Sequence, residues 1–413
     1  MNTIITYFIT RVKLIIHYYV PLLFYKRKLL ASLYYALFSR SFDREHQAVL
    51  EGKIKHIRNT FRHKSNYYLL IRNIHRIEKG LLMRPRKELF ARKYISETMD
   101  SFETICRTIK EEDNEQIQWF EDVLEMYFEV VGSDDLIDRE RTRFKSVRES
   151  IRSERRKKKK HTPYQRLTDE RPPVSYDALY ALSRQRRSVR WFTEKRVNKD
   201  LIDQCIAVAA QSPSACNRQP FTFHIIDDQK LLKEVVNLPM GTQGYSHNIP
   251  VFIVVVGNLD AYFDERDRHL IYIDASLASM SFMLALETLG MSSCPINWAD
   301  IEVREKKLQK ALKLRNDQRP VMCMAVGYPD PEGMVASSQK KSLERLRIYH
   351  SSDFTCSETA PLTEGAPSSG TASRSEGSPF SETTSPSEGA PSSESASRFE
   401  GTPSAGNTSA SKQ

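Results

Sequence analysis

The stretch PVFIVVVG at residues 250–257 is apolar throughout and rich in β-branched side chains. A short run of this kind is typical of a strand that is covered on both faces in the middle of a sheet. Two further β-rich runs lie on either side of it along the chain, FTFHIID at 221–227 and RPVMCMAVGYPD at 319–330. Together the three stretches predict one sheet in the second half of the chain, with 250–257 as its central strand.

Helical patterns alternate with these strands. NKDLIDQCIAVAAQ at 198–211 predicts a helix capped by Asn198, and IDASLASMSFMLALETLG at 273–290 predicts a long helix that ends at Gly290. The second helix is dense in Ala and Ser, which lets a ligand or another helix approach closely. Because a sheet needs its faces covered, the alternation of helices and strands predicts an α+β domain over residues 177–350.

The preceding region, residues 44–160, predicts helices only. NEQIQWFEDVLEMYFEVVG at 114–132 is the clearest case, with a polar cap, a glycine stop and one apolar stripe between them. The region ends in RSERRKKKK at 152–160, which we interpret as a solvated charge run, with contact to anionic lipid or RNA as the alternative. Residues 161–176 contain several prolines and predict a linker.

Residues 1–43 are apolar and basic. The run IITYFITRVKLIIHYYVPLLFY at 4–25 is interrupted by Arg11 and Lys13, and no uncharged stretch in it approaches the ~20 residues of a membrane-spanning helix. It also lacks the small-residue cleavage site of a signal peptide. Its apolar residues recur at helical spacing, which predicts either a helix in the membrane interface or a helix packed on its own domain or a partner subunit.

Charge is distributed unevenly along the chain. The net charge is +10, but residues 351–413 carry eight acidic and three basic side chains, so the first 350 residues hold about +15. This excess favours acidic partners, namely phosphate ligands, anionic membrane surfaces or nucleic acid. We expect no nucleic-acid partner, because the cluster at 152–160 lacks interleaved aromatic residues. Residues 351–413 repeat a sequence that is too polar to bury a core, which predicts a disordered tail.

Several isolated polar residues have a structural and a chemical interpretation. Six cysteines without CxxC spacing predict reduced thiols and no metal site. Cys216 and Cys294 are interpreted as space-filling side chains, with thiol redox coupling as the alternative. His75 and Glu78 share a helix face, where a salt-bridged surface is favoured over half a metal site or an acid/base pair. Asp274 is expected to cap its helix or to pair with an arginine.

Four segments concentrate residues that suit a cofactor pocket. RQRRSVRWF at 184–192 crowds four arginines against Trp and Phe, which suits a phosphate clamp anchored in the core, with a surface salt-bridge network as the alternative. SPSACNRQPF at 212–221 frames small and amide residues between prolines and exposes hydrogen-bond donors to a flat ring. LGMSSCPINWAD at 289–300 is expected to be a loop, and SSQKKSL at 337–343 adds a basic cluster.

In this order the four segments resemble motifs of the nitroreductase family of flavin enzymes, over residues 181–350. RRSVRWF is similar to the family's Arg-x-Ser-x-Arg-x-Phe signature, and SPSACNRQPF to its Ser-Pro-Ser-x-x-Asn-x-Gln-Pro loop. The resemblance implies a nitroreductase-like sheet flanked by helices, a homodimer and FMN bound at the subunit interface. By position, it implies that FMN is held by Arg186, Arg187, Ser188, Arg190, Ser214, Asn217, Pro295, Ile296, Asn297, Lys340 and Lys341.

The resemblance also implies a reaction. NAD(P)H would reduce the flavin and be replaced by a small-molecule acceptor, such as a nitroaromatic compound or a quinone. No side chain need act as a general acid, so no catalytic residue is named. The alternative is a non-redox scaffold at the membrane or at surface-polysaccharide machinery, because residues 66–90 resemble part of nitroreductase-like proteins from bacterial polysaccharide gene clusters. We expect a cytoplasmic protein that is peripheral at the inner membrane.

Overall fold

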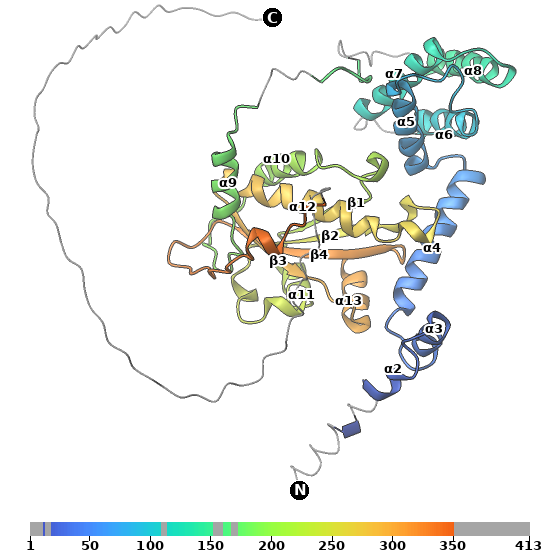
Figure 1. Ribbon diagram of the computed structural model, residues 1–413. Helices are drawn as coiled ribbons and strands as arrows, with labels where there is room; N and C mark the ends of the chain where they lie inside the picture. Colours follow the sequence, from blue (N-terminus) through green and yellow to red (C-terminus); the bar gives the residue numbers. More distant parts are fainter. Residues whose placement is uncertain (1–10, 13–17, 109–113, 152–159, 167–171, 351–413) are drawn as a thin grey trace, which may run out of the picture. The chain divides into compact units, whose positions relative to one another are not determined.

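The computed structural model describes residues 11–12, 18–108, 114–151, 160–166 and 172–350 (Figure 1). The chain divides into two compact units, residues 1–339 and 340–413. The charge run at 152–159 and the repeated tail lie outside the described residues, as does most of the apolar run at 4–25. All the helices and strands named below, from α2 to β4, belong to the first unit.

An antiparallel sheet of four strands forms the centre of the C-terminal half, in the order β1-β2-β4-β3 (Figure 1). The strands are β1 (Phe221–Ile226), β2 (Val251–Asn258), β3 (Ser292–Asn297) and β4 (Gln318–Gly327). Every residue of β2 is buried, and Val254 lies opposite His224 of β1 and Cys323 of β4. The predicted central strand is therefore confirmed.

Helices cover both faces of this sheet, which confirms the α+β fold. They are α10 (Lys199–Ala209), α11 (Gln229–Val235), α12 (Leu270–Thr288) and α13 (Glu302–Leu312). A further helix, α9 (Tyr176–Gln185), contacts α12 and has no buried residue. One core lies between the sheet and α10 and α12, and the other between the sheet and α11 and α13. Asn198 caps α10 as predicted, because its side chain accepts the backbone N–H of Asp200 at 2.9 Å.

The segment 289–300 differs from its prediction as a loop. Residues 292–297 form the edge strand β3, in which Pro295 lies opposite Met324 of β4. Proline is tolerated in an edge strand because its missing N–H can lie on the side where no further strand pairs with it. The Ser, Cys and Pro residues gave no alternating pattern, so the pairing with β4 decided the conformation.

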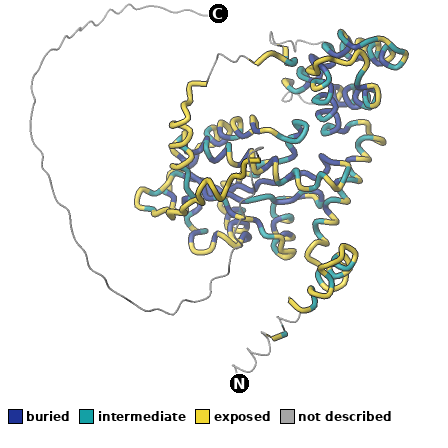
Figure 2. The backbone as a smooth tube through the Cα atoms, in the orientation of Figure 1, coloured by how far each residue is buried: buried dark blue, intermediate teal, exposed yellow. Residues whose placement is uncertain are grey.

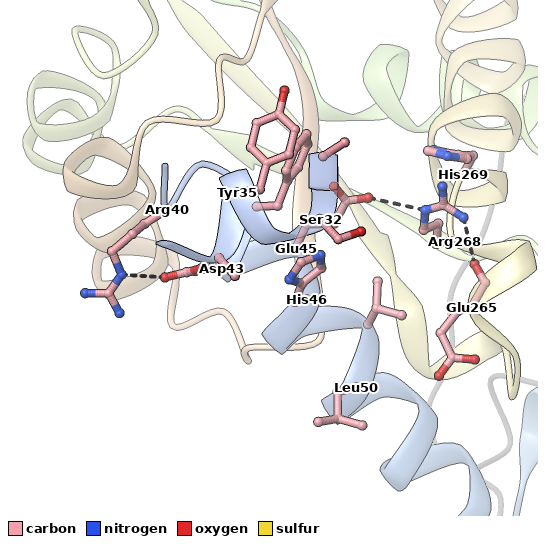
Figure 3. Close-up of a pocket in the computed structure, with 14 residues that line it drawn as sticks. Ser32, Tyr35, Arg40, Asp43, Glu45, His46, Leu50, Glu265, Arg268 and His269 are labelled. Carbon is pink, nitrogen blue, oxygen red and sulfur yellow. Dashed lines mark hydrogen bonds and ion pairs between the residues drawn. The ribbon is translucent and has the colours of Figure 1, made fainter. Parts of the chain in front are cut away.

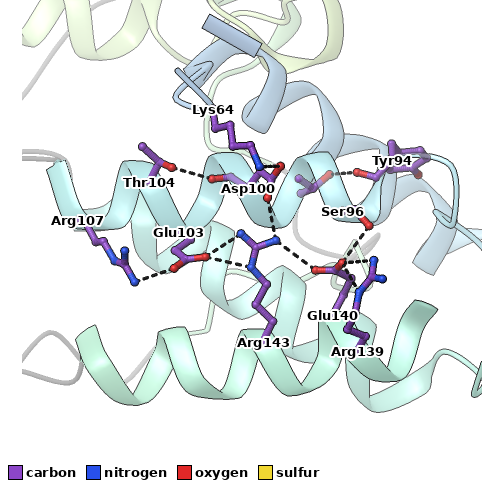
Figure 4. Close-up of polar contacts among 11 residues, drawn as sticks. Lys64, Tyr94, Ser96, Asp100, Glu103, Thr104, Arg107, Arg139, Glu140 and Arg143 are labelled. Atoms are coloured by element: carbon purple, nitrogen blue, oxygen red, sulfur yellow. Dashed lines mark hydrogen bonds and ion pairs between the residues drawn. The ribbon is translucent and has the colours of Figure 1, made fainter. Parts of the chain in front are cut away.

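The N-terminal half is helical throughout its described residues, as predicted. Its helices are α2 (Val20–Leu22), α3 (Lys28–Leu37), α4 (Asp43–Phe61), α5 (Tyr67–Leu82), α6 (Ile95–Thr108), α7 (Asn114–Val130) and α8 (Asp135–Ile151). Helices α5 to α8 share one apolar core. Figure 4 shows Arg143 of α8 joining α6 through Asp100 at 2.8 Å and Glu103 at 2.7 Å.

Helix α4 packs directly on the sheet domain. Its Ala48 shares a small core with Leu259 and Ile271, and a Cβ atom at Gly52 would come within 2.7 Å of the Leu259 carbonyl carbon. The absence of a side chain at Gly52 therefore permits this close approach. Lys55 adds ion pairs to Asp260 and Asp317. These contacts place the N-terminal helices beside the domain that carries the candidate site.

His56 of α4 makes the stability of this contact dependent on pH. Its imidazole is buried, with Nδ1 2.8 Å from the Asp260 carbonyl oxygen, and burial lowers its pKa to about 4. The unfolded chain takes up this proton near pH 6.5, so protonation favours unfolding as the pH falls from 6.5 towards 4 and has no effect above that interval. We expect the free energy of unfolding to fall by roughly 3 kcal/mol over this interval from His56 alone.

Denaturant unfolding at a series of pH values checks this prediction. His56→Asn keeps a donor for the carbonyl but cannot titrate, so its stability is expected to depend less on pH between 6.5 and 4. Equal pH dependence in the two proteins would show that His56 does not contribute.

Candidate functional site

The arginine cluster follows α9 and runs beside the edge strand of the sheet. Ser175 caps α9 by accepting the Ala178 N–H at 3.1 Å, and the helix ends at Gln185. The chain is then held against β3, because the Val189 N–H donates to the Ser293 carbonyl at 3.0 Å and Ser188 forms a β-bridge with Ser293. The cluster is therefore fixed at the edge of the sheet.

The arginines of this cluster lack close acidic partners. Among the residues that the structure describes, no carboxylate forms an ion pair with Arg186, Arg187 or Arg190. Arg190 is exposed, and its Nη1 donates to the Ser188 carbonyl 3.3 Å away. Arg187 donates to the Ala336 carbonyl at 2.6 Å. Arg190 can therefore bind an external anion, and Arg186 has only a longer-range interaction with the carboxyl of Glu287.

Unpaired polar atoms surround this cluster. The buried Nε of Arg186, Oγ of Ser293 and Oε1 of Glu287 have no hydrogen-bond partner. Burial raises the pKa of the Glu287 carboxyl, and Arg186 is near enough to oppose that rise. Buried polar atoms without partners are rare and are a common feature of binding sites. Sequence reasoning missed Glu287 and Ser293; the one signal for Glu287 was an acidic residue inside an apolar helix.

The loop at 212–221 is strained. Its one-turn helix η3 (Ala215–Asn217) has Cys216 at φ +54° and Asn217 at φ +56°, and Gln219 follows at φ +47°. Left-handed backbone is uncommon for residues other than glycine, and such strain clusters at functional sites. Ser214 Oγ holds the loop by accepting the Gln219 N–H at 3.1 Å.

Asp274 also holds this loop. Its carboxylate accepts the Ala215 N–H at 2.9 Å and does not cap α12, which begins at Leu270. Burial raises the pKa of Asp274, while Arg218 acts on it from longer range. Of the two roles expected for Asp274, capping of α12 was wrong, whereas the electrostatic interaction with Arg218 agrees with the expected pairing with an arginine. The side chain also positions the strained loop.

The two groups of predicted residues lie at opposite ends of α12 within one chain. Asp274 marks the end beside the 212–221 loop, and Glu287 marks the end beside Arg186. Glu287 follows Asp274 by thirteen positions, which correspond to about 20 Å of helix. One chain therefore brings Arg186, Ser188 and Arg190 together with β3, but not with Ser214 and Asn217.

The other predicted residues differ in accessibility. On β3, Ile296 is buried in the core with Cys294, Asn297 is exposed and Pro295 is partly exposed. Only the backbone of Ile296 is thus available to a ligand. Lys340 and Lys341 are exposed and belong to the second unit, residues 340–413.

Residues 183–328 match the family model described as the nitroreductase family. These residues form a nitroreductase-family domain. The matched part of the chain contains the arginine cluster, the strained loop and all four strands of the sheet.

Proteins similar to this domain include iodotyrosine deiodinases as well as nitroreductases. Iodotyrosine deiodinase 1 of Pongo abelii is 22% identical over 201 residues, which cover 41% of this chain and 68% of the relative. Iodotyrosine deiodinase of Haliscomenobacter hydrossis is 25% identical over 204 residues, covering 41% and 88%. Among solved structures, an FMN-dependent nitroreductase from Clostridium difficile is 22% identical with a TM-score of 0.36, covering 42% of this chain and 99% of that one.

A separate groove lies outside the nitroreductase-family motifs. It has a volume of about 880 Å³ and is enclosed by α3, α4 and residues 265–269 (Figure 3). Tyr35, His46 and Leu50 line it, and Arg268 lies 3.7 Å from Glu45 across it. The groove shows that α3 and α4 form a surface together with the start of α12.

The pair His75 and Glu78 on α5 is structural. His75 Nδ1 lies 3.5 Å from Glu78 Oε2, and Glu78 Oε1 accepts the indole N–H of Trp119 at 2.9 Å. The second contact ties α5 to α7. The salt-bridged surface favoured from sequence fits these contacts.

Proposed function

We propose that this protein is an FMN-dependent oxidoreductase that takes hydride from NAD(P)H and reduces a small-molecule acceptor. The observation that carries the proposal is a cluster of arginines without carboxylate partners among the described residues, fixed at the sheet edge of a nitroreductase-family domain. FMN carries a doubly negative phosphate, which planar guanidinium groups bind well. Arg186, Arg190 and Ser188 would hold that phosphate, while Arg187 fixes residues 336–337.

Residues beside the cluster fit the other end of the same cofactor. When bound, FMN supplies the hydride chemistry, and the protein orients it and adjusts its electronic environment. The exposed Asn297 side chain and the backbone of Pro295 and Ile296 would bind the edge of the ring.

A homodimer would complete this site. The outer face of α12 exposes Ile273, Leu277 and Met280, with exposed fractions of 52%, 44% and 39%. A stripe of this kind on a helix suits a second helix of the same type. Two copies of α12 related by a two-fold axis would run antiparallel and bring one chain's arginine cluster to the other chain's 212–221 loop. The arginine cluster and the 212–221 loop lie at opposite ends of α12 within one chain, which supports this arrangement.

Leu277→Asp is expected to convert the dimer into a monomer, because a charge would be buried in the apolar stripe. Flavin content should fall with it, since the 212–221 loop would no longer reach the partner's site. Sedimentation velocity and the visible spectrum measure both effects. Val303→Asp on α13, where the side chain is 65% exposed, is the matched control. A dimer that survives Leu277→Asp would contradict the proposed interface.

The visible spectrum of the purified protein tests the oxidoreductase proposal directly. We expect flavin absorbance that bleaches on anaerobic addition of NADH or NADPH and returns when an acceptor is added. Nitroaromatics and quinones are the first acceptors to add, and iodotyrosine follows from the names of the relatives. A protein that neither contains FMN nor takes it up would overturn the proposal.

A second candidate function is a non-redox scaffold bound to the membrane. No acidic residue occurs before Asp43, whereas six lysines and arginines do. Helix α3 exposes Leu29, Leu37 and the following Phe38 by 80%, 66% and 60% (Figure 2). An apolar face flanked by cations suits the surface of an anionic bilayer. We propose that this segment holds a cytoplasmic protein at the inner face of the membrane.

Co-sedimentation with vesicles tests the membrane contact. The full-length protein should pellet with phosphatidylglycerol-containing vesicles more than with phosphatidylcholine vesicles. Leu29→Asp with Leu37→Asp should remain in the supernatant, while the Val303→Asp control pellets. If the Leu29→Asp/Leu37→Asp variant pellets as much as the Val303→Asp variant, the exposed face of α3 is not the membrane-binding surface. A colourless protein that pellets would favour the scaffold over the reductase.

A further inference from the structure

Helix α5 of the N-terminal half lies against the strained loop of the nitroreductase-family domain. Arg72 and Arg76 are one turn apart on α5 and so share a face of the helix. Arg72 lies close enough to Arg218 of the loop for the two positive charges to repel each other. The helical region thus supplies cations beside a loop that the proposed function places at the flavin.

Three arginines at the contact between α5 and the strained loop, Arg72, Arg76 and Arg218, each lie over an aromatic ring. The guanidinium carbon is 5.5 Å from the ring centre of Phe263 for Arg72, and 4.6 Å from that of Tyr262 for Arg218. Because Tyr262 and Phe263 are adjacent in the chain, these two arginines are brought together. The guanidinium carbon of the third arginine is 3.7 Å from the ring centre of Tyr94. The three stacked arginines are Arg72, Arg76 and Arg218.

The positive charge of these arginines is only partly neutralised. Glu97 is 3.8 Å from Arg72 and already accepts the Asn73 amide at 3.0 Å. Arg218 is 6% exposed, and its buried Nε has no partner although its Nη1 donates to the Ala261 carbonyl at 3.0 Å. Burial, followed by repulsion from Arg76 and Arg218, lowers the pKa of Arg72. An added anion would relieve this repulsion.

We propose that Arg72, Arg76 and Arg218 bind the carboxylate of an aromatic acceptor and so select anionic substrates for the flavin site. The inference rests on the proposed oxidoreductase function and assigns the N-terminal helices a part in specificity. The guanidinium groups match the planar carboxylate, and the edge of the partly exposed Phe263 ring adds an apolar contact for the acceptor.

Steady-state kinetics with two matched acceptors tests the inference in the full-length protein. 4-Nitrobenzoate carries the carboxylate, and 4-nitrobenzamide is its neutral counterpart. We expect Arg72→Met to raise the KM for 4-nitrobenzoate roughly tenfold, the effect of losing one charge-assisted hydrogen bond. The KM for the amide and the FMN content should stay unchanged. Arg72→Lys should restore part of the difference, and Lys79→Met on an exposed position of α5 should match the wild type.

Isothermal titration of 4-nitrobenzoate gives a readout that does not depend on turnover. Weaker binding in Arg72→Met than in Lys79→Met supports the inference. Equal KM values for the two acceptors in the wild type, or binding unaffected by Arg72→Met, would overturn it while leaving the reductase proposal intact. A protein without FMN would overturn the reductase proposal, and the titration would still decide whether these arginines bind a carboxylate.

Discussion

Replacing Arg186 and Arg190 together with alanine is expected to weaken FMN binding by roughly a hundredfold to ten-thousandfold. Each arginine would lose a charge-assisted hydrogen bond to the phosphate, worth about 1.5–3 kcal/mol. Neither side chain forms an ion pair with a carboxylate among the described residues, although Arg186 is near enough to the buried Glu287 to oppose the rise in its pKa. Titration of the flavin-free protein with FMN, followed by flavin fluorescence, measures the change.

Arg184→Ala is the matched control for this experiment. Arg184 is the first arginine of the cluster and lies in the last turn of α9, two residues before Arg186, with its guanidinium carbon 5.9 Å from the ring centre of Tyr180. Its removal should leave FMN affinity within about twofold of the wild type, since surface charges act weakly at a distance. If the Arg186→Ala/Arg190→Ala variant retained its flavin, the assignment of the phosphate site to this cluster would be wrong.

Arg319→Met is expected to lower the free energy of unfolding by about 3–5 kcal/mol. Arg319 is 1% exposed, and its Nη2 lies 2.8 Å from Asp300 and 3.4 Å from Glu305. Glu305 is 2% exposed and also lies 3.3 Å from Arg44 of α4. Removing Arg319 would leave a buried carboxylate short of positive charge, which costs more than the pair gains by forming. Denaturant unfolding measures the loss.

The double variant Arg319→Met with Glu305→Met separates this cause from general damage to the core. Removing both charges should cost less than the two single substitutions added together, because no buried charge is then left alone. Additive losses would indicate that the two side chains stabilise the fold independently. Since Arg44 joins the same cluster from α4, weaker packing of α4 on the sheet domain is also expected.

Local features were predictable because their causes lie within a few residues. The apolar run at 250–257 determined a buried strand, and Asn198 determined the start of α10. The helical stripe at 114–132 determined α7. In contrast, β3 depends on pairing with β4 about thirty residues later, and its own residues carry no strand pattern. The hydrogen bond between Asp274 and Ala215 was missed for the same reason, since the two residues are distant in sequence.

The sequence by itself determined the fold class, the order of the motifs and the residue types suited to a phosphate-bearing ring. Only the tertiary structure decided that Arg186 and Asn217 lie at opposite ends of α12, and that α5 brings Arg72 to the strained loop. The physical reason is that the surroundings of a side chain come from elements packed against it, and these elements are remote along the chain. The spacing of residues in the sequence predicts which side chains share a face of a helix or strand. Which element packs against that face depends on the tertiary structure.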